Sequence, residues 1–141
     1  MTRFLRMFCV AAAIALAAAG CSQAADDAAP LKELQRTRSG DLDVVLLSDA
    51  DGLTHGKDSF VLEFRAQAGG QLRDVGTVKA NATMPMAGMP PMFGTLVLRP
   101  SDTPGRYLVD SDLSMAGTWQ INVEWQGPAG TGSTTLRGAV Q

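Results

Sequence analysis

Hydrophobic and polar residues alternate with a period of two over much of the chain. The clearest run covers 119–125, where Trp, Ile, Val and Trp are separated by Gln, Asn and Glu. Because successive side chains of a β-strand point to opposite faces, this run predicts a strand with one buried face and one wet face. Other segments with strand-like patterns lie at 42–47, 60–65, 78–84, 93–98, 106–109 and 133–140.

Short segments rich in Gly, Pro and Asp separate these runs, as turns do between strands. After Gly40 no segment shows an apolar period of 3.6, and only 31–38 has a helix-like pattern. Seven or eight short strands joined by turns predict an all-β fold, an antiparallel β-sandwich of about seven strands. A β-barrel is the alternative architecture.

The N-terminus has the pattern of a secretion signal. Two arginines precede an apolar segment over 7–19 that is too short for a stable membrane anchor. Small residues then lead directly into Cys21, an arrangement that resembles a bacterial lipobox. We therefore expect residues 1–20 to be removed as a lipoprotein signal peptide and Cys21 to be lipidated. Ordinary cleavage near Ala19, which leaves a secreted protein with a free cysteine, is the alternative.

The residues after Cys21 indicate where the mature protein is held. Ser22 follows the cysteine, and by resemblance to bacterial sorting rules the absence of Asp there favours the outer membrane. The segment 22–30 is rich in Ala and Asp without an apolar period, which is typical of a flexible tether. We expect a tether over 21–40 and one periplasmic domain over 41–141, long enough to build a core without disulfides.

Charge and motifs exclude several classes of protein. The chain carries 12 basic and 14 acidic residues, a net charge of −2, and no basic run, so we expect no nucleic-acid partner. The sequence contains no nucleophile elbow, no metal-hydrolase histidine spacing and no glycine-rich phosphate loop. We therefore expect a protein that is not an enzyme.

Four methionines crowd into nine residues between two predicted strands. We expect Pro85 to end the first strand, the next strand to start near Phe93, and Gly88 to reverse the chain between them. Thioether sulfur is a soft ligand that suits Cu(I), so this loop is a candidate copper site. Methionine also fills irregular gaps and adapts to partners, so a hydrophobic lid and a protein-docking surface are the alternatives. The four residues are Met84, Met86, Met89 and Met92.

Two further positions carry candidate chemistry. Met115 lies four residues before Trp119, which predicts either a sulfur–aromatic core contact or a fifth thioether with an aromatic face shielding a cuprous ion by cation–π attraction. His55 is the only histidine and lies in a predicted turn. It is either a solvated loop residue or an additional ligand if the fold brings that turn beside the methionines.

Three motifs in order along the chain resemble the YtkA-like family and are similar to the neighbouring FixH-like family. They are Met84-Pro-Met86-Ala-Gly-Met89, Pro104-Gly105-Arg-Tyr107 and Ser114-Met115-Ala-Gly117-Thr-Trp119, and the resemblance covers roughly 41–126. It implies a small extracytoplasmic immunoglobulin-like sandwich, sometimes fused to metal-efflux components, and FixH-like relatives are tied to the assembly of haem–copper oxidases. The positions that carry over are Met84, Met86, Met89, Met115 and Trp119.

Taken with the signal segment, the resemblance favours a free-standing lipoprotein, without the transmembrane anchor of FixH-like proteins or a fused efflux module. We expect a lipid-anchored periplasmic protein that binds or transfers Cu(I) through its methionine loop, as an accessory to copper handling or export. The alternative is a non-metal accessory domain that docks through the same loop on an envelope partner, such as an efflux or oxidase-assembly complex.

Overall fold

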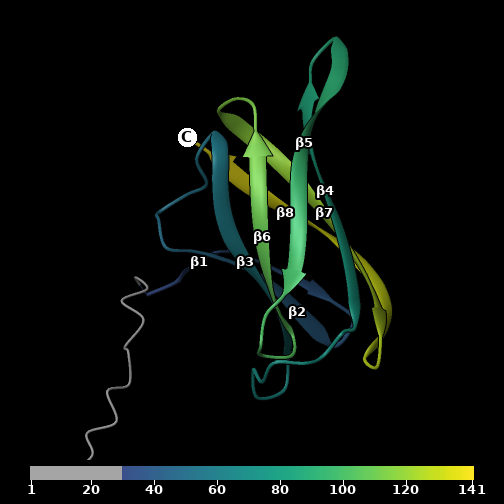
Figure 1. The fold of residues 1–141 in the computed structure, drawn as a ribbon. Helices are drawn as coiled ribbons and strands as arrows, with labels where there is room; N and C mark the ends of the chain where they lie inside the picture. The colour runs from purple at the N-terminus through teal and green to yellow at the C-terminus, as the bar shows by residue number, and fades with distance from the viewer. Residues whose placement is uncertain (1–29) are drawn as a thin grey trace, which may run out of the picture.

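Eight antiparallel strands make up the computed structural model, which describes residues 30–141 (Figure 1). They are β1 (Lys32–Ser39), β2 (Leu42–Ser48), β3 (Gly56–Ala66), β4 (Thr77–Met86), β5 (Met89–Pro100), β6 (Arg106–Leu113), β7 (Gly117–Gly127) and β8 (Gly130–Val140). The described residues form no α-helix, so the predicted all-β, antiparallel fold is confirmed, with eight strands rather than seven. Within the same residues there is no helix of the length and apolarity needed to cross a membrane.

The strands follow the order β1-β2-β3-β6-β5-β4-β7-β8 in one strongly curled sheet. Its two ends come together, because β1 lies against β8 and the Ser39 hydroxyl donates a hydrogen bond to the Ser133 carbonyl, 3.1 Å away. The sheet is therefore close to a barrel, and its two halves face each other as the layers of a sandwich do.

The core lies between those two halves. On β7 the predicted inward residues are all buried, with Trp119, Ile121 and Val123 fully enclosed and Trp125 only 4% exposed. Across the core, the Trp125 ring meets Phe64 of β3 edge-on, with the ring centroids 5.3 Å apart. The period-two pattern therefore predicted the register of β7 correctly.

The structure corrects the expected start of the domain. Residues 32–39, which we assigned to the tether and described as helix-like, form β1 and pair along β2. The sequence hides this strand because polar side chains on β1 can join a network of charges instead of alternating with apolar ones. The predicted signal peptide and Cys21 lie outside the described residues.

A second correction concerns the prolines of the methionine segment. β4 continues through Pro85 to Met86, and β5 already begins at Met89, so the segment is a β-hairpin and not a loop. Its partners stop earlier: β7 pairs with β4 only as far as Thr83, and β6 pairs with β5 only from Thr95. The hairpin therefore projects beyond its neighbours (Figure 1, upper right), and proline is tolerated on such unpaired edges.

Candidate functional site

The base of the β4–β5 hairpin holds two facing methionines. Met84 and Met92 are direct cross-strand partners, and both are partly buried against the main core. Two residues further along each strand, Ala82 pairs with Gly94. A methyl group at Gly94 would lie 2.4 Å from Leu113 Cδ2, so a larger residue there would force the buried Leu113 side chain or β5 to move.

Met84 also reaches the start of β7. A methyl group at Gly117 would lie 3.0 Å from Met84 Cε and 3.1 Å from its sulfur, so the thioether rests directly over this glycine. Gly117 has a φ of 145°, a backbone conformation that other residues rarely adopt. Glycine at this position thus combines an unusual backbone with room for a neighbouring thioether.

Met115 comes to the same place from the turn between β6 and β7. Its backbone carbonyl accepts a hydrogen bond from the indole nitrogen of Trp119, with the two atoms 3.0 Å apart. Met115 lies two residues before Gly117, and its side chain is 39% exposed. The fully buried Trp119 therefore ties this turn to the core below the hairpin. We call Met84, Met92 and Met115 the base methionines.

The other two methionines form the tip of the hairpin. Met86 and Met89 are cross-strand partners on either side of a two-residue turn at Ala87 and Gly88. Gly88 has a φ of 73°, which confirms the predicted chain reversal at this glycine. Met89 is 58% exposed, and Phe93 further along β5 is 74% exposed. The tip is thus an open apolar surface, unlike the packed base.

His55 lies before β3, at the end of the barrel that also carries Met115, because Gly56 pairs with Leu113 at the end of β6. Its ring Nδ1 lies 2.8 Å from the Gln141 carbonyl oxygen. A carbonyl oxygen can only accept, so Nδ1 is the donor in this contact. Between residues 30 and 141, no group of three or more His, Cys, Asp or Glu side chains is placed to hold a metal ion.

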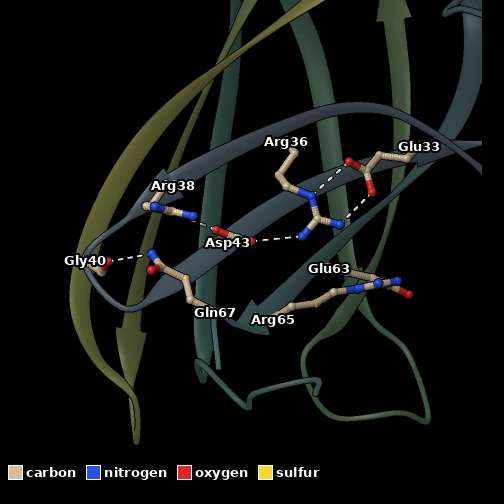
Figure 2. A network of polar contacts seen from close by, with 8 residues as sticks. All are labelled: Glu33, Arg36, Arg38, Gly40, Asp43, Glu63, Arg65 and Gln67. Atoms are coloured by element: carbon tan, nitrogen blue, oxygen red, sulfur yellow. Dashed lines mark hydrogen bonds and ion pairs between the residues drawn. The ribbon is translucent and has the colours of Figure 1, made fainter. Parts of the chain in front are cut away.

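A network of charged residues that the sequence pattern did not predict lies on the outer face of β1, β2 and β3 (Figure 2), and Arg106 of β6 joins it. Its centre is Glu63, whose side chain is fully buried. One carboxylate oxygen accepts a hydrogen bond from Arg106 Nε at 2.7 Å, and the other accepts one from Arg65 Nε at 2.7 Å. This carboxylate is therefore satisfied on both oxygens, as a buried charge must be.

A second part of the network joins β1 to β2. Arg36 donates two hydrogen bonds to Glu33, at 2.9 and 2.7 Å, and a third to Asp43 at 2.9 Å (Figure 2). The hydrogen bonds from Arg36 lower the pKa of Glu33. In turn, the hydrogen bonds that Glu33 and Asp43 accept raise the pKa of Arg36. The arrangement links strands and leaves these carboxylates paired, which is a structural role. The concentration of charged and polar residues over 33–38 was the sequence signal for it.

The comparisons with known proteins give a family for this fold. The model of the YtkA-like family matches residues 36–124, which is more than half of the chain. The chain belongs to the YtkA-like family. No curated protein and no solved structure matches the chain. The matched region of this YtkA-like protein includes the whole hairpin, the turn that carries Met115, and Trp119.

Proposed function

We propose that this YtkA-like protein binds Cu(I) through thioethers at the base of its β4–β5 hairpin and hands the ion on. The observation that carries the proposal is the contact between Met84 and Gly117, which brings the base of the hairpin beside the turn that carries Met115. There the Met84 thioether lies over the glycine, Met92 faces Met84 across the hairpin, and Met115 adjoins from the preceding turn.

The chemistry of this end of the barrel suits a soft cation. Thioethers are neutral, soft donors that select Cu(I) over Zn²⁺ and Mg²⁺. Unbranched methionine side chains can move to complete a coordination sphere at low cost, because their rotamers are many. The tip pair Met86 and Met89 supplies further donors for an incoming or departing ion, and the His55 ring is a further candidate ligand at the same end.

The proposed setting is the periplasm. Lipidation of Cys21 would hold the domain at the outer membrane through a tether, and YtkA-like membership supports an extracytoplasmic accessory role without catalysis. A partner in efflux or oxidase assembly would then take or deliver the copper. Replacing Cys21 by Ser should move the protein from the membrane fraction to the soluble fraction or block processing. Unmodified Cys21 in the wild-type mass spectrum would contradict the anchor.

Metal selectivity tests the binding step. Anaerobic titration should show Cu(I) binding that Zn²⁺ and Mg²⁺ do not displace. Affinity should change little between about pH 5 and 8, because a thioether has no proton to lose, whereas a site built on a titratable ligand would weaken as that ligand takes up a proton. Displacement of Cu(I) by equimolar Zn²⁺ would reject the thioether site.

A second candidate function rests on the exposed tip. Met89 and Phe93 present apolar surface on a projecting hairpin, the kind of surface that docks on a partner protein. Substituting Met89 and Phe93 by Ser should abolish capture of an envelope partner while leaving Cu(I) binding at the base intact. If the same substitutions remove copper and leave partner capture unchanged, the docking role fails.

A further inference from the structure

All sulfur atoms between residues 30 and 141 belong to methionines, and all of them lie on the hairpin or beside Gly117. The two cysteines of the chain, Cys9 and Cys21, lie before this region. The five thioethers differ in their access to solvent. Met89 is 58% exposed and Met115 is 39% exposed, whereas Met84, Met86 and Met92 are partly buried.

We propose that this end of the barrel is an oxidation site that accepts oxygen from peroxides in a fixed order, Met89 and Met115 first and Met84 and Met92 last. In each step the sulfur attacks one peroxide oxygen, the S–O bond forms and the O–O bond breaks. Hydrogen peroxide is reduced to water and the thioether becomes a sulfoxide. Access of the oxidant to sulfur sets the order, because a thioether has no ionised form that would change its reactivity.

The two stages have different structural consequences. A sulfoxide on Met89 points its oxygen into water and leaves the fold unchanged. Met84 packs against the core and over Gly117, where a methyl group would already lie 3.1 Å from its sulfur. An added oxygen there is polar and takes up space beside the glycine, so it disrupts the contact between the hairpin and β7. The first stage thus consumes oxidant harmlessly, and the second loosens the hairpin.

This inference does not rest on copper binding, since metal-free thioethers react in the same way. Its first test treats the purified metal-free protein with hydrogen peroxide and maps sulfoxide in peptides over time. Met89 and Met115 should be oxidised before Met84 and Met92. Rates for all five methionines within about twofold of one another, or earlier oxidation of Met84, would overturn the order.

A second test separates the two stages by stability. After exhaustive oxidation the wild type should unfold at a lower urea concentration, whereas the double variant Met84→Leu, Met92→Leu should keep its own midpoint. Leucine has nearly the same volume as methionine and no sulfur to oxidise, so packing is largely kept. An equal loss in both proteins, or no loss in the wild type, would overturn the role of the base. The peptide map of the wild type decides the order even if the variant folds poorly.

Discussion

At the residue scale, Trp119 connects the core to the candidate site. Its side chain is fully buried, and its indole nitrogen holds the carbonyl of Met115. By contrast, Asn122 lies on the outer face of the same strand and shares hydrogen bonds with Asn81 and Thr135. The two positions test the register of β7 from opposite faces.

Replacing Trp119 by Ala should lower the free energy of unfolding by about 3 to 5 kcal/mol, because the change leaves a large cavity and an unpaired carbonyl. Asn122→Ala should cost less than about 1 kcal/mol, since water replaces its exposed hydrogen bonds. Urea unfolding followed by circular dichroism measures both. Equal shifts of the two midpoints would show that the inward and outward faces are wrongly assigned.

Glu33 gives a prediction about acid stability. Its pKa is lowered first by the hydrogen bond from Arg36, so the folded state holds the proton less tightly than the unfolded chain, whose ordinary value is 4.5. The stabilisation is therefore complete above the unfolded pKa and is lost as the pH falls through the lower, folded pKa. In Glu33→Gln the free energy of unfolding should fall less steeply than in wild type as the pH drops below about 4.5. The difference should be modest, because the pair is partly exposed.

The measurement is the urea midpoint of wild type and Glu33→Gln at several pH values between about 3 and 7. Glu124→Gln serves as the control, because Glu124 is exposed and lies on β7, in the other half of the sheet. The two curves for wild type and Glu33→Gln should converge as the pH falls. Parallel curves would show that the Arg36 contact does not contribute to stability.

At the element scale, the β4–β5 hairpin is separable from the barrel. Residues beyond Met84 and Met92 pair only with each other, since β7 and β6 end their pairing at Thr83 and Thr95. Pro90 and Pro91 lie at the register shift between the two strands, where a missing donor costs little. The tip therefore adds surface and sulfur to the protein but few contacts to the core.

Replacing residues 85–91 by the turn Asn-Gly keeps Met84 opposite Met92 and removes the tip. We expect the free energy of unfolding to change by less than about 1 kcal/mol, as for other surface changes. The shortened protein should also keep most of its Cu(I) affinity, because the base methionines remain. A much lower melting temperature for the shortened protein than for wild type would show that the tip supports the barrel.

The strength of a pattern decided which elements could be predicted from sequence. β7 alternates apolar and polar residues because one of its faces is buried, so both the strand and its register were predictable. β1 consists mainly of charged and polar residues, and β2 is buried on both faces, so neither shows a clean period of two. The hairpin was mistaken for a loop because proline usually ends a strand, and only the missing neighbours on both edges explain why these prolines are accommodated.

At the scale of the whole molecule, the sequence predicted an antiparallel all-β fold but not the closure of its sheet. Closure depends on β1 meeting β8, a contact between segments about a hundred residues apart that no local pattern encodes. The pairing of β4 with β7 and of β3 with β6 brings the hairpin, the turn of Met115 and the start of β3 to one end of the barrel. The methionines were identifiable from sequence, whereas their division into a packed base and an open tip was not.

The central claim is that the base methionines form the copper site, and competition for Cu(I) against a cuprous chelator tests it most directly. Three proteins are compared: wild type, the base variant Met84→Leu, Met92→Leu, Met115→Leu, and the tip variant Met86→Leu, Met89→Leu. All should remain folded, because Leu for Met conserves volume and costs under about 1.5 kcal/mol per site. The base variant should bind Cu(I) at least about tenfold more weakly than wild type, a loss of about 1.4 kcal/mol, while the tip variant stays close to wild type. Equal copper retention by a folded base variant and by wild type would show that the base methionines do not hold the ion.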